Sequence, residues 1–451
     1  MPNAPGRSGS RGRAPAPLLA IGRSRRRGTA GAAALLVAAG TLAACGGDSG
    51  GPPTLSWYTN PDNGGQKEIA ARCSEASGGA YTISTSVLPN AAAGQREQLI
   101  RRLAAEDSSI DLMSLDPPFV PEFAEAGFLA PVPEDVAERT TDGVVQGAID
   151  GATWNDELVA VPFWANTQIL WYRKSVAETA GLDMSQPVTW DQVVQAAQDQ
   201  DVLIGAQGAR AESLTVWLNG LIESAGGSII EENADKPEDI VLGLDTEAGQ
   251  RAAEVMRAVA ESGQVGAAFS TADENAGATG FESDQGGFTV NYPFIWTQAQ
   301  GKVADGVLDQ SVIDDYDAAV WPRVDADTPP APPLGGIDLG IGAFSENVDL
   351  AFEAAECIRS EENQAFYFTN SGNPASLASV FDDPEVLEAF PQAPVIRESL
   401  ELAAPRPQTP YYSEITGGVQ RMYHPPASVG DETGAEATEF IGAVLRGDEL
   451  L

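Results

Sequence analysis

Acidic side chains at the ends of predicted strands are the residues best placed to bind or react with another molecule. Asp116 directly follows the strand expected at 110–115 (IDLMSL), and Asp62 lies in the loop after the strand expected at 54–59 (TLSWYT). A carboxylate in such a position can accept hydroxyl hydrogens from a ligand, or it can cap the next helix. For Asp116 the next helix is the segment 118–126, so both roles stay open.

Arrangements for catalysis or metal binding are scarce by comparison. The only histidine in the chain is His424, which precedes Pro425-Pro426 and has the context of a loop residue rather than a base. A single histidine excludes zinc sites that need several histidines, and it means that only His424 could be the base of a Ser-His-Asp triad. Carboxylates abound, but we identify no spaced pair with the roles a glycosidase needs. Tyr411-Tyr412 is the only tyrosine pair suited to a metal. We therefore expect no enzyme activity, no cofactor and no metal site.

Composition narrows the class of partner. The 451 residues include 65 acidic and 26 basic side chains, for a net charge of −39. Nucleic acid is excluded as a partner, because phosphate backbones need lysine and arginine to neutralise them. The apolar fraction of 43% is ordinary for a globular protein. The length corresponds to roughly two or three domains, each large enough for its own core.

The first part of the chain predicts the sheet that must position Asp116 and Asp62. Strands are expected at 54–59, 81–88 and 110–115, and helices at 66–77 and 94–106. Strand, helix, strand, helix, strand is typical of a parallel α/β sheet. Ligands of such sheets lie beyond the carboxyl ends of the strands, where both carboxylates fall.

The alternation of short strands and helices gives way near residue 158 to a longer β-prone run. The segment 159–172 (VAVPFWANTQILWY) is a long β-prone run, and 189–192 is a capping box that opens a helix. An apolar helix is expected at 212–226 and a strand at 287–290. The proline-rich stretch 329–333 cannot be helix or central strand, and it predicts a crossing between domains.

The amino-terminal segment is predicted to be a targeting signal. Residues 1–44 hold seven arginines and no acidic residue, and the apolar run 30–44 is shorter than the ~20 residues that span a bilayer. The end of this run, Leu-Ala-Ala before Cys45, followed by Gly-Gly-Asp-Ser-Gly-Gly, resembles a bacterial lipobox. The resemblance implies cleavage before Cys45, lipid on its sulfur, a flexible tether at 45–53 and a location at the extracytoplasmic face of the cell membrane. The alternative is an ordinary secretory signal with an incidental cysteine.

The two remaining cysteines are expected to pair. Cys73 and Cys357 each share a helical face with apolar residues, so both are predicted to be buried. Disulfides persist in exported proteins, although two separate buried thiols remain possible. A bridge would bring a late helix against an early one, so the first domain would be completed by late sequence.

Several segments together resemble a known family. The lipobox, VPFWANTQILWYRK, GGFTVNYPF and LGGIDLGI before a cysteine-bearing helix are similar to ABC-transporter sugar-binding proteins. More narrowly, DLMSLD-x₃-PEFAEAG, AESLTVWLN and RP-x-TP-x-Y resemble the trehalose-binding lipoproteins of actinobacteria.

The resemblance implies an α/β, two-lobe periplasmic-binding-protein-like fold of type 2. Each lobe is expected to be a mostly parallel sheet flanked by helices, with the ligand cleft at the hinge. The expected lobes are 54–165 with 336–390, and 166–335 with 391–451.

The same resemblance implies a set of sugar-binding residues. They are expected on first-lobe loops and strand ends, at the two crossings and in the second lobe: Asp62, Gln95, Asp116, Asn166, Glu212, Trp217, Asn291, Tyr292, Gly336, Ile337 and Arg406, with Gly335 beside them. Alternatives stay open for four of these residues. Asn166 can pin the hinge backbone, Glu212 can stabilise a helix N-terminus, Trp217 can be core, and Arg406 can form a structural salt bridge.

The implied function is capture of a neutral disaccharide, with trehalose favoured, for an ABC permease. The protein is expected to be a monomer that is attached to the membrane through the lipid on Cys45. The competing readings are a binding protein for another oligosaccharide or a non-sugar solute, a metal-binding relative, a structural lipoprotein and a secreted glycosidase.

Overall fold

The computed structural model describes residues 51–451. The predicted signal segment 1–44 and the lipidation expected at Cys45 lie outside the described residues. No helix within 51–451 is both long and apolar enough to cross a membrane.

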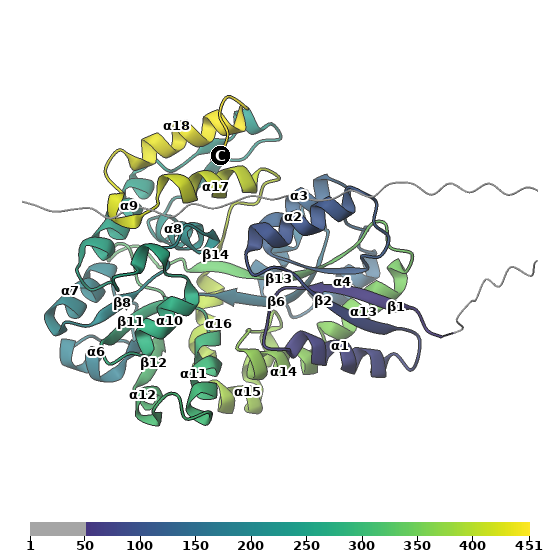
Figure 1. Cartoon of the computed structure of the whole chain (residues 1–451), viewed down its shortest axis with the longest axis horizontal. Helices are drawn as coiled ribbons and strands as arrows, with labels where there is room; N and C mark the ends of the chain where they lie inside the picture. The colour runs from purple at the N-terminus through teal and green to yellow at the C-terminus, as the bar shows by residue number, and fades with distance from the viewer. Residues whose placement is uncertain (1–50) are drawn as a thin grey trace, which may run out of the picture. The chain divides into compact units, whose positions relative to one another are not determined.

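The first sheet has the parallel start that the sequence predicts (Figure 1). Strand β1 (Thr54–Thr59) pairs in parallel with β2 (Thr82–Val87) on one side and with β3 (Leu112–Leu115) on the other. Helices α1 (Gly65–Ala76) and α2 (Ala92–Leu103) make the connections, and their apolar residues are buried. The expected strand and helix boundaries therefore agree with the structure to within three residues.

A late strand completes this sheet. Strand β13 (Pro333–Ile341) runs antiparallel to β3, with Asp338 opposite Leu115, and antiparallel to β6 (Val161–Thr167) on its other side. The short β14 (Ala404–Pro405) pairs in parallel with the start of β13. Late sequence therefore completes the first sheet.

The second sheet has the order β12-β7-β11-β8. Its strands are β7 (Ile169–Arg173), β8 (Leu203–Gly205), β11 (Gly286–Asn291) and β12 (Tyr316–Ala319). The long run expected at 159–172 is two strands, because the buried Gln168 breaks it between β6 and β7.

Both sheets are mixed: the first has three parallel and two antiparallel pairings, and the second has one parallel and two antiparallel. The expectation of a mostly parallel sheet therefore holds for the first sheet and is wrong for the second. Strand β7 is antiparallel to both β11 and β12, and β13 is antiparallel to both β3 and β6. Parallel neighbours require a long crossover connection, usually a helix. Strands β6 and β7 are joined by a single residue, so the chain passes directly from the first sheet to the second.

Helices and short hairpins cover the sheets. Those before the second sheet are η1 (Pro117–Phe119), α3 (Val120–Glu125), α4 (Glu134–Thr141), α5 (Gln146–Gly151), β4 (Thr153–Trp154) and β5 (Glu157–Leu158). Those around the second sheet are α6 (Lys174–Ala180), α7 (Trp190–Gln200), α8 (Glu212–Ser224), β9 (Ile230–Glu232), η2 (Pro237–Asp239), β10 (Val241–Leu242), α9 (Glu247–Glu261), η3 (Phe269–Thr271), α10 (Glu274–Glu282), α11 (Phe294–Ala304) and α12 (Gln310–Asp314). After β13 come α13 (Val348–Ile358), α14 (Glu361–Ser371), η4 (Ala378–Asp382), α15 (Pro384–Ala389), α16 (Ala393–Leu402), α17 (Tyr412–Met422), η5 (Pro426–Ser428) and α18 (Thr433–Leu445).

Local signals explain where these helices begin. The capping box predicted at 189–192 is present, because the Thr189 side chain accepts from the Gln192 backbone N–H and the Gln192 side chain accepts from the Thr189 N–H.

Helices α17 and α18 contribute Ile415, Val419 and Ile441 to the core that also contains α8 and α9. The carboxyl-terminal segment therefore packs with the second lobe, and the exact lobe boundaries stay a prediction.

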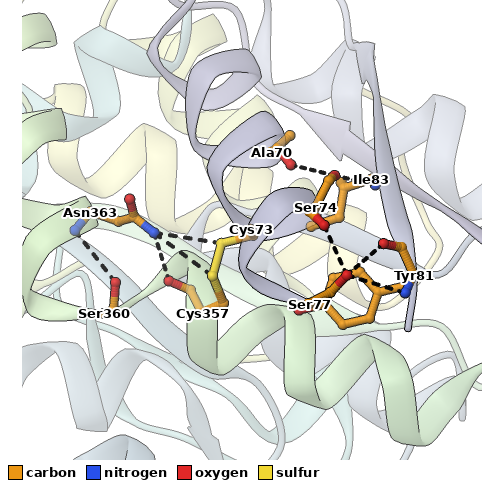
Figure 2. Close-up of a disulfide and its surroundings, with 9 residues drawn as sticks. All are labelled: Ala70, Cys73, Ser74, Ser77, Tyr81, Ile83, Cys357, Ser360 and Asn363. Atoms are coloured by element: carbon orange, nitrogen blue, oxygen red, sulfur yellow. Dashed lines mark hydrogen bonds between the residues drawn. A yellow bond between two sulfur atoms is a disulfide. The ribbon is translucent and has the colours of Figure 1, made fainter. Parts of the chain in front are cut away.

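A disulfide joins α1 to α13 (Figure 2). Cys73 on α1 is fully buried, Cys357 on α13 is partly buried, and their Cα atoms lie 5.8 Å apart. The Asn363 side-chain amide donates to the Cys357 carbonyl oxygen at 2.8 Å, which fixes the end of α13 beside the bridge. The bridge therefore holds the late helix against the first helix of the chain.

Loss of the bridge is expected to destabilise the first lobe. The two cysteines are 284 positions apart, and closing so long a loop in the unfolded chain contributes at most about 5 kcal/mol. We expect Cys357→Ser to lower the free energy of unfolding by ~2–5 kcal/mol, measured by urea denaturation.

A thiol count checks the same prediction independently. A variant without Cys45 should show no alkylatable thiol by mass spectrometry under non-reducing conditions. Two alkylatable thiols in the folded protein would contradict the bridge.

Candidate functional site

A cavity of about 840 Å³ lies where the two sheets meet the crossing strands. Its walls come from the end of β3, the start of α2, strands β6 and β13, the N-terminal ends of α8 and α10, the end of β11, and α17 with the loop before it. Elements of both lobes therefore contribute to one cavity.

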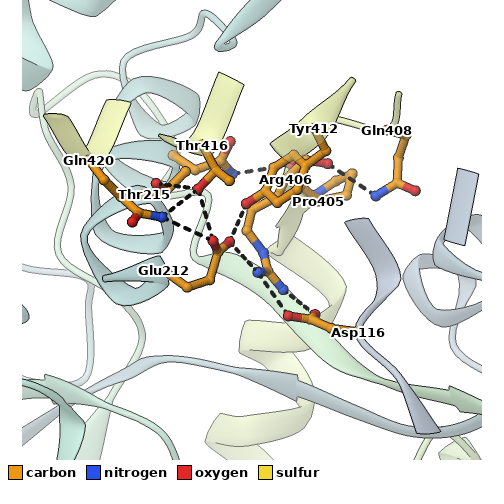
Figure 3. Close-up of polar contacts among 10 residues, drawn as sticks. Asp116, Glu212, Thr215, Pro405, Arg406, Gln408, Tyr412, Thr416 and Gln420 are labelled. Atoms are coloured by element: carbon orange, nitrogen blue, oxygen red, sulfur yellow. Dashed lines mark hydrogen bonds and ion pairs between the residues drawn. The ribbon is translucent and has the colours of Figure 1, made fainter. Parts of the chain in front are cut away.

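Asp116 enters this cavity from the carboxyl end of β3. It occupies the position before η1, yet within the described chain its side chain makes no capping hydrogen bond. Its two carboxylate oxygens instead accept from both terminal nitrogens of Arg406, at 3.1 Å for the Oδ2–Nη1 pair (Figure 3). The capping alternative for Asp116 is therefore not what the structure shows.

Arg406 connects Asp116 to Glu212 at the start of α8. Its Nη1 lies 2.7 Å from Glu212 Oε1, and only 4% of its side chain is exposed. Glu212 also accepts from the Tyr412 hydroxyl and, at 2.8 Å, from the Thr416 hydroxyl (Figure 3). The salt bridge expected as the alternative for Arg406 is present, and it lies in the cavity wall.

Burial and neighbouring charge shift the pKa values of Glu212 and Arg406 in opposite directions. Burial raises the pKa of Glu212, while the Arg406 charge opposes that rise. Burial alone would lower the pKa of Arg406, but the negative charges of Asp116 and Glu212 raise it well above its ordinary value. Arg406 is therefore always a cation, and it presents its donors between two acceptors.

Further polar groups line the same cavity. The Asn166 side-chain oxygen accepts from the Thr167 backbone N–H, so its amide nitrogen can donate to a ligand. The Gln95 amide nitrogen donates to the Pro89 carbonyl, which leaves its oxygen as an acceptor. Burial raises the pKa of the Tyr292 hydroxyl, so this group stays protonated and can donate. The cavity thus offers both donors and acceptors.

Of the two glycines in the second crossing, Gly336 is required by a close backbone approach. Gly336 has φ of 135°, and a Cβ placed there would lie 2.3 Å from the Trp164 carbonyl oxygen. No other residue tolerates both constraints. Gly335, Gly336 and Ile337 all line the cavity, as the sequence predicts.

Aromatic rings supply the apolar part of the wall. Trp164, Phe119 and Tyr292 line the cavity, and Trp164 is 9% exposed. Trp164 was not among the predicted site residues. Because side chains two apart on a strand share a face, the predicted Asn166 pointed to it.

Three predicted residues lie elsewhere. Asp62 accepts from the backbone N–H groups of Gly64 and Gln66, and it lines a separate hollow of about 380 Å³. Trp217 is fully buried in the core of the second lobe, in contact with Trp190 and Phe269.

Asn291 is also fully buried, but it acts next to the site. Its amide donates to the Glu274 carbonyl and its side-chain oxygen accepts from the Tyr292 N–H. Asn291 therefore positions two residues of the cavity wall without lining it. The core alternative holds for Trp217, and Asp62 serves as a turn and helix-start residue.

Other lining residues carried no signal in the sequence. They are polar residues on loops and helix ends: Asn60, Asn90, Arg210, Asp273, Glu274, Thr416 and Gln420. In the sequence they look like any other polar residues, and only the folded structure shows that they lie close to the crossing strands.

Comparison with known proteins places the chain among binding proteins. Residues 75–365 match the family described as bacterial extracellular solute-binding protein. A curated relative, the probable ABC transporter-binding protein of Deinococcus radiodurans, is 24% identical over 285 residues, which are 58% of this chain and 61% of that relative.

Solved structures agree in fold. The maltose-bound MalE3 of T. maritima superposes with a TM-score of 0.74 at 23% identity, covering 88% of this chain and 99% of the other. An ABC transporter solute-binding protein of Thermotoga lettingae, bound with α-D-tagatose, gives a TM-score of 0.72 at 20% identity, covering 87% and 100%. At these identities the likeness shows the two-lobe fold alone.

A buried carboxyl group lies beside the cavity on the second crossing. Asp338 is 2% exposed, and its Oδ2 atom has no hydrogen-bond partner among residues 51–451. Burial raises its pKa well above 3.8, and the nearby charge of Asp116 adds to the rise. A folded-state pKa above the unfolded value means that the folded protein binds more protons in the intervening pH range.

The contribution of Asp338 to stability should therefore fall as pH rises above about 4, because Asp338 must either keep its proton or be buried as an anion. Asp338→Asn cannot titrate, so the melting temperature of the variant relative to the parent should be higher at about pH 8 than at about pH 4.5. Thermal unfolding followed by circular dichroism at both pH values measures this difference. A difference that does not change with pH would show that Asp338 is ionised without penalty.

Proposed function

Because the chain belongs to the bacterial extracellular solute-binding protein family, whose members bind ligands rather than convert them, we propose that it captures a neutral disaccharide between its lobes. In this proposal it delivers the sugar to the permease of an ABC importer. Trehalose is the favoured ligand, because several segments of the chain resemble the trehalose-binding lipoproteins of actinobacteria.

The observation that carries the proposal is the Asp116–Arg406–Glu212 network in the wall of a cavity that also holds Trp164. A sugar ring needs donors and acceptors for its hydroxyls and an apolar surface for its C–H face. Asp116 retains free lone pairs after its two contacts with Arg406, whereas Glu212 already accepts from Arg406, Tyr412, Thr416 and Gln420. Charge-assisted hydrogen bonds such as those Asp116 can accept from a sugar are the stronger ones.

The volume and the charge of the cavity support a neutral ligand of about disaccharide size. A volume of about 840 Å³ lies within the range of small-molecule sites. Five acidic residues line the cavity against three arginines (Glu97, Asp116, Glu212, Asp273 and Glu274 against Arg96, Arg210 and Arg406), so an anionic ligand is disfavoured. The T. maritima structure with maltose has the same fold, which fits a disaccharide of similar size.

Ligand binding would favour the closed arrangement of the lobes. Asp116 belongs to the first sheet and Glu212 to a helix of the second lobe. A sugar that contacts both stabilises the state in which they are close, and this is how hinge closure is coupled to binding. Lipid on Cys45, also a proposal, would keep the receptor near its permease.

Titration calorimetry with trehalose, maltose, sucrose and cellobiose tests the proposal. We expect saturable heat with at least one disaccharide, strongest with trehalose, and no product formation. Absence of binding to all four sugars would contradict the disaccharide class. A preference for another of the four would remove only the trehalose assignment.

The Asp116→Asn variant tests the assigned geometry. The amide keeps the shape but accepts at one end only, and hydrogen bonds to charged groups contribute about 1.5–3 kcal/mol each. We expect sugar affinity to fall at least ~10-fold, measured by calorimetry, since ~1.4 kcal/mol corresponds to one decade.

Asp62→Asn is the matched control. It makes the same chemical change at a carboxylate that does not line the main cavity. The amide can replace only one of the two backbone N–H contacts of Asp62, so the melting temperature should fall slightly while the sugar affinity stays close to that of the parent. Equal losses of affinity in both variants would place the sugar nearer to the loop of Asp62.

A further inference from the structure

The segment that follows α18 returns to the interlobe cavity. The chain turns at Gly447, which has φ of 76°, and the Asp448 backbone N–H donates to the Ala443 carbonyl at 2.9 Å. Glycine adopts this left-handed conformation without strain and commonly follows the end of a helix. Helices α17 and α18 pack against each other (Figure 1), and the turn brings Leu451 onto α17 at Gly417.

Arg421 positions this segment. Its Nη1 atom donates to the Leu450 carbonyl at 3.2 Å, and its guanidinium group lies over the Phe440 ring, 4.5 Å from the centroid. Arg421 belongs to α17 and Phe440 to α18, so the arginine side chain spans the two helices. This contact places the backbone of Leu450 and, with it, the neighbouring Leu451.

Leu451 lies in the wall of the interlobe cavity. The face of α17 that lines the cavity consists of residues spaced as one side of a helix: Ser413, Thr416, Gly417 and Gln420. A Cβ atom at Gly417 would lie 2.7 Å from Leu451 Cδ1 and 3.0 Å from Leu451 Cδ2, so the leucine methyl groups rest on bare backbone. A side chain at residue 417 would therefore displace Leu451 from the wall.

Leu451 adds apolar surface to a polar part of this wall. The side chains on the α17 face carry hydroxyl and amide groups, and 53% of Leu451 is exposed. Apolar surface gains free energy when a ligand removes it from water. The C–H face of a sugar ring can cover the leucine, while the sugar hydroxyls pair with the polar groups beside it.

We propose that Leu451 is a sugar-contacting residue that supplies the apolar edge of the interlobe site on the second-lobe side. Trp164 offers the corresponding apolar surface at the crossing strands. The inference rests on the proposed function, because it needs a sugar in this cavity. Covering the exposed half of a leucine side chain corresponds to a roughly threefold to tenfold gain in affinity.

Calorimetric titration of three variants tests the role of this side chain. The probe is the disaccharide among trehalose, maltose, sucrose and cellobiose that the parent binds most tightly. Leu451→Asn keeps a similar size but removes the apolar surface, so affinity should fall roughly threefold to tenfold, whereas Leu451→Met should bind like the parent. Leu450→Asn makes the same change at a residue that is 85% exposed and does not line the cavity, so it should also bind like the parent.

The outcomes separate this inference from the proposed function. Unchanged or tighter binding by Leu451→Asn would overturn the inference and leave the proposed function intact. Equal losses in Leu451→Asn and Leu450→Asn would report a change in the whole segment and would overturn the contact at Leu451. A parent that binds none of the four sugars would contradict the proposed function, and the inference with it.

A double-mutant cycle tests whether Arg421 acts through Leu451. Arg421→Met removes the donor to the Leu450 carbonyl without changing a residue that lines the cavity. We expect it to weaken sugar binding in the parent by no more than Leu451→Asn does, and to have no further effect in the Leu451→Asn background. An equal loss in both backgrounds would mean that Arg421 acts through α17 itself, and it would overturn the assigned placement of Leu451.

Discussion

The ladder between β6 and β13 is the constraint on which both the lobes and the cavity depend. It pairs Asn166 with Gly335 and Trp164 with Ile337, so the residues of the two crossings become neighbours. Side chains alternate along a strand, and a slip of one residue would turn Trp164 and Asn166 away from the cavity together. The close approach at Gly336 fixes this register, because a side chain there would collide with the Trp164 carbonyl. One hydrogen-bonded ladder thus sets the connection between the lobes and the floor of the site.

The charged residues beside the ladder of β6 and β13 come from segments far apart in the chain. Asp116 and Arg406 are 290 positions apart, and Glu212 comes from a third segment. Burying such a cluster costs desolvation energy, and apolar replacements of buried ion pairs are often neutral or stabilising in other proteins. Stability alone therefore does not account for the cluster. Preorganised acceptors around a fixed cation do account for it, because they hold a polar ligand without reorganising when it arrives.

Local patterns in the sequence predict the parts of the fold that depend on neighbours in the chain. The order of elements from β1 to β3, the capping box at Thr189 and the strand-end position of Asp116 all follow from hydrophobic spacing and turn chemistry. The same patterns do not separate Trp164 from Trp217, because both are aromatic residues in apolar segments and only tertiary packing decides which one faces the cavity. The antiparallel direction of β7 and β13 also escapes prediction, since their partners β11, β12 and β3 come from distant parts of the chain. Arg406 could be assigned from its proline neighbours, but its partners come from two distant segments.

The crossing strands are packed by an apolar cluster on one side and face the polar interlobe cavity on the other. This difference determines how the lobes can move. One apolar cluster joins Ala165 and Leu334 of the crossings to Ile295 and Tyr316 of the second lobe and to Phe368 of α14. Separating these residues would expose apolar surface at about 25 cal/mol per Å², with nothing to replace the lost contacts. The contacts across the interlobe cavity include the ion pairs of Arg406 with Asp116 and Glu212, together with the Phe119–Tyr412 pair, whose ring centroids lie 5.4 Å apart. Water or a ligand can replace polar contacts at little net cost. Opening should therefore widen the polar side while the apolar cluster stays intact, so bending is confined to the ladder of β6 and β13.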